Sequence, residues 1–108
     1  MKLEKCYQPG CGGEMKHYKL NGDTGLHYLQ CENCGYCGPN MDTEPQAIAA
    51  HNRGFYAIEL AMSFAKLTEM VMYSADPIEA ADAYKTQAKK AQELDRLFRS
   101  ADKAARGE

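Results

Sequence analysis

Five cysteines confined to one end of the chain constrain the fold more than any other feature. All of them lie between positions 6 and 37 of the 108 residues, and the rest of the chain contains none. Four form two close pairs, Cys6-x4-Cys11 and Cys31-x2-Cys34, separated by nineteen residues. Two such pairs offer four soft thiolates, which is the tetrahedral donor set that zinc prefers. The pattern therefore predicts one Zn2+ per chain, bound by these four cysteines.

The fifth cysteine leaves an alternative open. Cys34-x2-Cys37 also has the spacing of a metal-binding turn, so Cys37 could replace Cys31 or Cys34 as a ligand. We favour Cys31 and Cys34, because Gly35 follows them as a glycine also follows the first pair. A residue without Cβ lets backbone amides approach the sulfurs. Cys37 is then a spare thiol beside the site.

The chain also contains three histidines, His17, His27 and His51. Each could replace a cysteine, but a lone histidine on a strand or helix is more often a surface residue, and four thiolates need no further ligand. An all-cysteine site has no open position for water or substrate, so we expect it to be structural. Its binding free energy, of order 10–16 kcal/mol in zinc-finger peptides, would then be the folding energy of the module.

The segment around the cysteines is expected to be a small zinc ribbon, residues 1–42. Residues 14–20 and 26–31 are candidate strands, and the loop 21–25 between them is rich in Asn, Gly and Asp, which tolerate positive φ. Large aliphatic residues are few here. A core of this size cannot hold the segment together unaided, so the metal has to replace it.

Beyond the ribbon the composition changes to Ala, Glu, Lys, Leu and Met, which is typical of helices. Thr43 is a candidate cap for a first helix, which either continues or breaks at Gly54. Asp76 and Pro77 then start a second helix. Apolar residues recur at alternating steps of three and four, as in paired helices. The expected contact positions are Ala57, Leu60, Phe64, Leu67 and Val71, then Ala80, Tyr84, Gln87, Ala91, Leu94, Phe98, Ala101 and Ala105.

The short link between these helices predicts an antiparallel helical hairpin, residues 43–108. Each arm has about 30 residues and spans roughly 45 Å. The fold class is therefore α+β, a zinc ribbon followed by a long helical hairpin. A second apolar set on the first helix would stay partly exposed, and either a second copy packs there, giving a homodimer, or the ribbon folds back onto it. This set is Phe55, Ile58, Met62, Ala65 and Met72.

Composition and motifs exclude several classes. The net charge is −2, whereas proteins that bind the phosphate backbone of nucleic acids commonly carry a net positive charge. No apolar run reaches the length of a membrane span, and the start lacks the apolar core of a secretory signal, so we expect a cytoplasmic protein. No nucleophile elbow, phosphate-binding loop or open metal site occurs, and we predict that the chain is not an enzyme.

Three stretches follow a shared pattern: residues 11–14 (CGGE), 28–39 (YLQCENCGYCGP) and 44–53 (EPQAIAAHNR). In order and spacing they resemble the restriction alleviation protein Lar family, small zinc-ribbon proteins of phages and prophages. The resemblance covers about the first 54 residues. The chain departs from the family pattern in its wider first cysteine pair and in His51, where the family has tryptophan.

The resemblance implies a phage-encoded protein of the host cytoplasm that relieves type I restriction, apparently by favouring modification over cleavage. Its partner would be a host defence or restriction–modification protein, bound without catalysis. The residues leave other functions open, namely a homo-oligomeric adaptor or thiol redox chemistry at Cys34 and Cys37. A nucleic-acid-binding ribbon is a further alternative. Its basic and aromatic groups would be Lys16, His17, Tyr18, Lys19, His27 and Tyr28.

Overall fold

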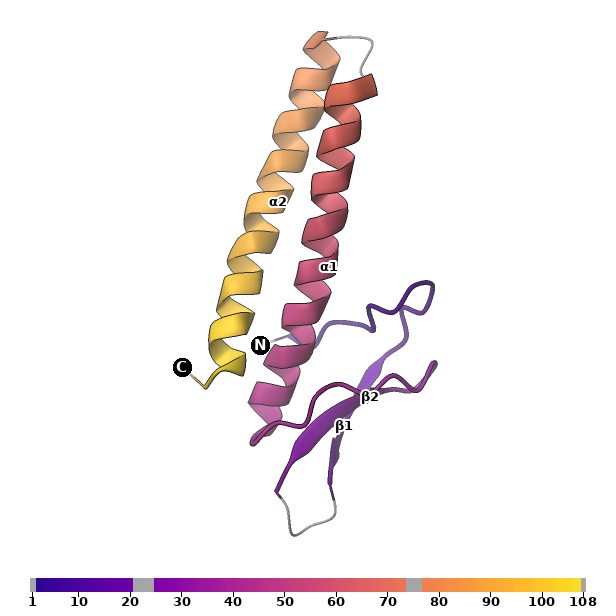
Figure 1. The fold of residues 1–108 in the computed structure, drawn as a ribbon, viewed down its shortest axis with the longest axis vertical. Helices are drawn as coiled ribbons and strands as arrows, with labels where there is room; N and C mark the ends of the chain where they lie inside the picture. Colours follow the sequence, from indigo (N-terminus) through magenta and orange to yellow (C-terminus); the bar gives the residue numbers. More distant parts are fainter. Residues whose placement is uncertain (1, 21–24, 74–76, 108) are drawn as a thin grey trace.

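The computed structural model describes residues 2–20, 25–73 and 77–107. Within them the chain forms a two-stranded antiparallel hairpin, β1 (Met15–Lys19) and β2 (His27–Cys31), followed by two long helices (Figure 1). These are α1 (Glu44–Tyr73) and α2 (Pro77–Ala105), which lie side by side. The predicted α+β architecture is confirmed. The chain measures 61 × 31 × 17 Å because the helical hairpin is long and only two helices wide.

The hairpin places one face against α1. Met15 pairs with Cys31 and Tyr18 with Tyr28, so that odd-numbered side chains share one face and even-numbered ones the other. Met15, Leu29 and Cys31 on the first face are buried. Each strand is slightly shorter than predicted, and the predicted loop lies outside the described residues except for its last glycine.

The start of α1 follows the predicted capping. The backbone amide of Gln46 donates to Oγ1 of Thr43 at 3.2 Å, which satisfies one of the free amides of the first turn. The Gln46 side chain accepts a hydrogen bond from the same hydroxyl instead of reaching the Thr43 backbone. The helix then continues without a break through Gly54. The second helix begins at Pro77 as predicted, while its predicted cap lies outside the described residues.

The helices pack together, but part of the predicted register on α1 is wrong. Ala57 and Phe64 are exposed, Phe64 with 56% of its surface accessible, whereas Leu67 is buried as predicted. Tyr56 and Ser63, each one residue earlier, are buried instead. The prediction failed because it ranked positions by apolarity, and a phenylalanine scores above a neighbouring serine.

A buried hydrogen bond explains why the serine faces inward. Nε2 of Gln87 on α2 donates to Oγ of Ser63 at 3.1 Å, and both side chains are buried. On α2 the predicted contact positions are largely confirmed, with Ala91 and Ala101 also buried. Tyr84 stays exposed, and the side chain of Ala80 lies outside the described residues. The polar pair fixes how the two helices are rotated and aligned, since any other register leaves the amide unpaired.

One hydrophobic cluster joins the cysteine-rich segment to α1. Cys6, Met15, Leu29, Cys31 and Ala47 form a contiguous buried group, to which the N-terminal segment, both strands and α1 contribute. The domain boundary that we predicted between residues 42 and 43 stays a prediction, and α1 begins just after it, at Glu44. The ribbon therefore shares its core with α1.

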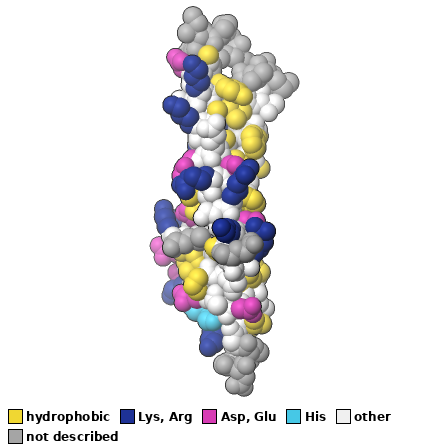
Figure 2. Space-filling model, turned by 90° about the vertical axis from the view of Figure 1, so that its left-hand side faces the viewer, with side chains coloured by type: hydrophobic (Ala, Val, Ile, Leu, Met, Phe, Trp, Pro, Cys, Tyr) yellow, Lys and Arg dark blue, Asp and Glu magenta, His cyan; other side chains and the backbone are white. Residues whose placement is uncertain are grey.

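The surface carries charges of both signs. On the face in Figure 2, basic and acidic side chains are interspersed along the length of the molecule, with hydrophobic side chains between them. That face has no single-sign stripe of the kind that binds a phosphate backbone. Neither helix of the described chain is apolar over a stretch that would cross a bilayer.

The Ser63–Gln87 pair gives a first prediction. Ser63→Ala should lower the free energy of unfolding by about 1–3 kcal/mol, because it leaves the buried Gln87 amide without its partner. Adding Gln87→Met should restore most of that loss, since both groups at the contact are then apolar. Denaturant unfolding of the metal-loaded protein measures both, with Gln92→Met on the exposed side of α2 as the control. Additive losses in the double variant would contradict a specific pair.

Candidate metal centre

Four cysteine sulfurs come together beside the hairpin. The Sγ atoms of Cys6, Cys11, Cys31 and Cys34 all lie within 4.8 Å of one another. Two of the separations are 3.7 Å, between Cys6 and Cys34, and 3.4 Å, between Cys11 and Cys31. Tetrahedral thiolates at 2.3 Å from a zinc ion lie about 3.8 Å apart. All five cysteines of the chain are free thiols, so the cluster can hold a metal ion.

Backbone amides surround the sulfurs in a repeated pattern. Each sulfur accepts a hydrogen bond from the amide two residues further on, and such donors stabilise thiolates. The amides of Gly13 and Asn33 lie 3.4 Å from the sulfurs of Cys11 and Cys31. The corresponding donors to Cys6 and Cys34 are Gln8 and Tyr36. The two cysteine turns thus share a pattern of amide donors to sulfur, although the loop of the first pair is longer.

Gly13 allows these turns to approach each other. A Cβ at this position would lie 2.7 Å from Cβ of Asn33 and 2.9 Å from Sγ of Cys31. Gly12, directly after the first pair, has a φ of +64° that suits glycine, but its surroundings are open. The close contact at Gly13 was not predicted, although the tandem glycine after Cys11 was a signal that could have identified it.

The cysteines of the metal-free cluster differ in acidity. A hydrogen bond from the Asn33 side chain and one from the Gly13 amide lower the pKa of Cys11 to about 6. Burial instead raises the pKa of Cys6 well above its ordinary value. At neutral pH Cys11 is therefore largely a thiolate and Cys6 a thiol. A metal ion that binds all four sulfurs must displace the Cys6 proton, so its affinity falls as the pH falls.

Cys37 lies outside the group of four. Its side chain is exposed, and its thiol donates to the Gly35 carbonyl at a sulfur–oxygen distance of 3.6 Å. The structure thus brings together the four cysteines that the sequence analysis favoured. That these four bind the ion, and not a set that includes Cys37, stays a prediction.

His51 is not the surface residue that we expected. It is buried on α1, with 1% of its surface accessible, and its ring stacks on Tyr7 at 5.2 Å between centroids. Its Nε2 lies 3.0 Å from the carbonyl oxygens of both Glu4 and Lys5. Because carbonyls only accept, Nε2 must carry the hydrogen. Burial lowers the pKa of His51, which favours this neutral form. The Lar family, which this segment resembles, has tryptophan at this position, and that could have indicated a buried ring.

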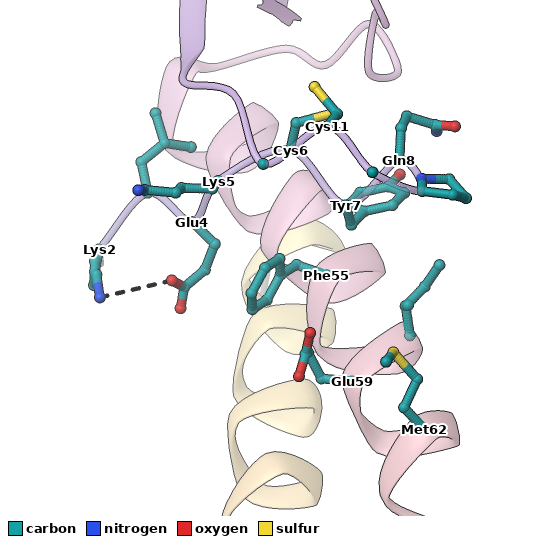
Figure 3. Close-up of a pocket in the computed structure, with 15 residues that line it drawn as sticks. Lys2, Glu4, Lys5, Cys6, Tyr7, Gln8, Cys11, Phe55, Glu59 and Met62 are labelled. Atoms are coloured by element: carbon teal, nitrogen blue, oxygen red, sulfur yellow. Dashed lines mark ion pairs between the residues drawn. The ribbon is translucent and has the colours of Figure 1, made fainter. Parts of the chain in front are cut away.

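Neighbouring residues of α1 bind the same N-terminal segment, residues 2–7, which we call the arm. The Asn52 side chain accepts from the Glu4 amide at 3.0 Å and donates to the Lys2 carbonyl. The hydroxyl of Tyr56 donates to the Glu4 carboxylate at 2.9 Å. Figure 3 shows the arm passing over α1, with Cys6 beside Cys11. The helix therefore positions Cys6 through the arm that carries it.

Gly54 gives the arm room to dock. A Cβ there would lie 2.9 Å from the ring of Tyr7. The hydroxyl of Tyr7 in turn lies 2.6 Å from that of Tyr36, just beyond the second cysteine pair. Tyr7 thus connects α1 to both cysteine turns.

No family model, curated protein or solved structure matches this chain. The family resemblance therefore remains an expectation from the residues that carry it.

The ligand set can be tested by substitution. Cys6→Ser, Cys11→Ser, Cys31→Ser and Cys34→Ser should each lower the affinity for zinc, because every change removes one thiolate from the cluster. Cys37→Ser is the matched control and should retain one zinc ion per chain. Competition with a chromophoric chelator at neutral pH measures the affinity. If the Cys37→Ser variant loses zinc and the Cys34→Ser variant retains it, the fourth ligand is Cys37 and not Cys34.

Docking of the arm predicts an unusual response at Gly54. Replacing a helical glycine by alanine normally stabilises a protein by about 1 kcal/mol. Gly54→Ala should instead destabilise this one, since the new methyl group meets the Tyr7 ring. In a Tyr7→Ala background the same change should become stabilising. Thermal unfolding of the four proteins tests the reversal, and a stabilising effect in both backgrounds would show that the ring does not press on α1.

Proposed function

We propose that this chain is a non-catalytic zinc-ribbon protein that binds a component of a host restriction–modification system. Zinc is the metal of choice because four soft thiolates in a tetrahedral cluster are its preferred site. Such a site is closed, so its role is structural. The partner is proposed from the resemblance to restriction alleviation proteins in residues 11–53. An acidic chain of this kind suits contact with protein more than with nucleic acid.

The main observation in favour of a binding role is a row of exposed apolar side chains on α1, Ile58 and Met62, which we call the apolar row. Ile58 and Met62 have 41% and 62% of their surfaces accessible. Together with Phe55 and Glu59 they form one wall of a hollow of about 790 Å³, whose other wall is the arm and the first cysteine turn (Figure 3). The ribbon therefore covers the apolar face of α1 only in part. Exposed apolar side chains gathered in a hollow are typical of a contact site.

The same row admits a homodimer as an alternative. Two copies could bury Ile58 and Met62 against each other, with the ribbons as adaptors at the ends. Sedimentation equilibrium separates the two possibilities: a monomer at micromolar concentration leaves the row free for another protein, whereas a dimer that the Met62→Asp variant dissolves would place a second copy there.

Nucleic acid binding is the other alternative, and one observation favours it. The rings of Tyr18 and Tyr28 stack on the outward face of the hairpin at 5.6 Å between centroids, as in a platform for bases. Lys16 beside them is already paired with Glu32 at 2.7 Å, which weakens its attraction for phosphate. An oligonucleotide titration at two salt concentrations tests whether the chain binds nucleic acid, because binding to phosphates must weaken as the salt concentration rises.

The proposed function is tested by the plating efficiency of unmodified phage on a host with a type I restriction system. Expression of the chain should raise plating efficiency. Ile58→Asp/Met62→Asp should abolish the rise, because two buried carboxylates would be unpaired in the contact. Lys66→Glu, an exposed change on the same helix, is the control. Zinc content of the purified variants reports that they fold.

Each outcome of this experiment tests a different part of the proposal. No rise with the wild-type chain would refute the restriction target. A full rise with the double variant would refute the apolar row as the contact surface. Co-elution of the chain with the purified restriction–modification complex, lost in the double variant, supports both parts of the proposal.

A further inference from the structure

The hairpin brings two histidines into direct contact. His17 on β1 faces Leu29, and His27 on β2 faces Lys19, so the two histidines are diagonal neighbours on one face. Nε2 of His17 lies 2.7 Å from Nδ1 of His27, and their ring planes differ by 15°. His17 is exposed as expected and His27 is partly exposed, but neither is an isolated histidine. Adjacent strands have placed two nitrogen ligands side by side.

Their separation fits a metal ion in place of the shared proton. Two nitrogens at 2.0–2.1 Å from one ion lie about 2.9 Å apart in cis positions at a right angle, and about 3.4 Å apart in a tetrahedron. The observed 2.7 Å is nearer to the first value. Square-planar and octahedral coordination, with ligands at right angles, is typical of Cu2+ and Ni2+.

A carboxylate lies behind one of these rings. Oε1 of Glu44 is 3.8 Å from Nδ1 of His17, the nitrogen that does not face His27. Metal-binding histidines commonly direct their second nitrogen to a carboxylate, which fixes the ring and makes the ligating nitrogen more basic. Glu44 is the first residue of α1, and the capped start of the helix holds its backbone in place.

We propose that His17 and His27 form a second metal site, distinct from the cysteine cluster, for a divalent ion that accepts two cis imidazoles, with Glu44 orienting His17. The side chain of His17 is 30% accessible, so the remaining coordination positions are open to water or to a ligand from solution. The site is separate from the cluster because Cys31 lies four residues further along β2, roughly 13 Å away. Nitrogen donors here and sulfur donors there also favour different ions.

The test titrates zinc-loaded protein with NiCl2 at pH 7.5 by isothermal calorimetry. The wild type should bind one Ni2+ saturably, and His17→Gln and His27→Gln should each weaken binding at least tenfold. Glu44→Gln should weaken it about 10–100-fold, the usual effect of losing a carboxylate behind a ligand. Lys19→Gln is the matched control, because Lys19 lies opposite His27 on the same face but is not one of the two histidines. It should bind at least as tightly as the wild type.

Nuclear magnetic resonance gives a second readout that a change in folding would not reproduce. Paramagnetic Ni2+ should broaden the imidazole signals of His17 and His27 and spare the buried His51. Absence of saturable heat in the wild type would overturn the proposal. So would equal affinity in the His17→Gln and His27→Gln variants that retain their zinc.

Discussion

Docking of the arm on α1 is the interaction on which the rest of the structure depends. A sheet of two five-residue strands is not stable alone, and the small hydrophobic cluster beneath it has to pack against another element. That element is α1, which also forms hydrogen bonds to the arm through His51, Asn52 and Tyr56. Because buried polar groups are costly when unpaired, these contacts hold the arm in one position. That position also places Cys6 among the other three sulfurs.

The cysteine cluster and the docked arm therefore support each other. A metal ion would draw together two turns that lie far apart in the sequence, and its binding energy, of order 10–16 kcal/mol in zinc-finger peptides, would offset the ordering of a segment with few apolar residues. The helix contributes a second constraint, since α1 orients the arm through hydrogen bonds that do not involve the cysteines. Gly13 and Gly54 serve the same end, because each removes a Cβ where two segments meet. The compactness of this half thus comes from metal ligands, glycines and a few buried polar bonds.

The sequence predicted the features that have a local cause. Cysteine spacing within each pair, the Thr43 cap and Pro77 each act within a few residues, and the strands and helices begin close to where they were expected. That the two pairs meet followed from the donor set that a metal ion requires. Features that depend on contacts between distant segments were missed. Ser63 faces inward because of Gln87, twenty-four residues away, and His51 is buried because the arm covers it. The pairing of His17 with His27 needed the strand register, which the alternation of residues alone did not supply.

The two helices are longer than the part of α1 that supports the ribbon. The arm and the ribbon contact only the N-terminal part of α1, and both helices extend well beyond them (Figure 1). The additional turns lie beyond the part of α1 that supports the cysteine cluster. They extend an α1 surface on which Ile58, Met62 and Phe64 remain accessible. The arm forms one wall of the hollow that contains the first two of these residues, and it also carries Cys6. The state of the metal centre and the shape of this surface are therefore physically linked through one short segment.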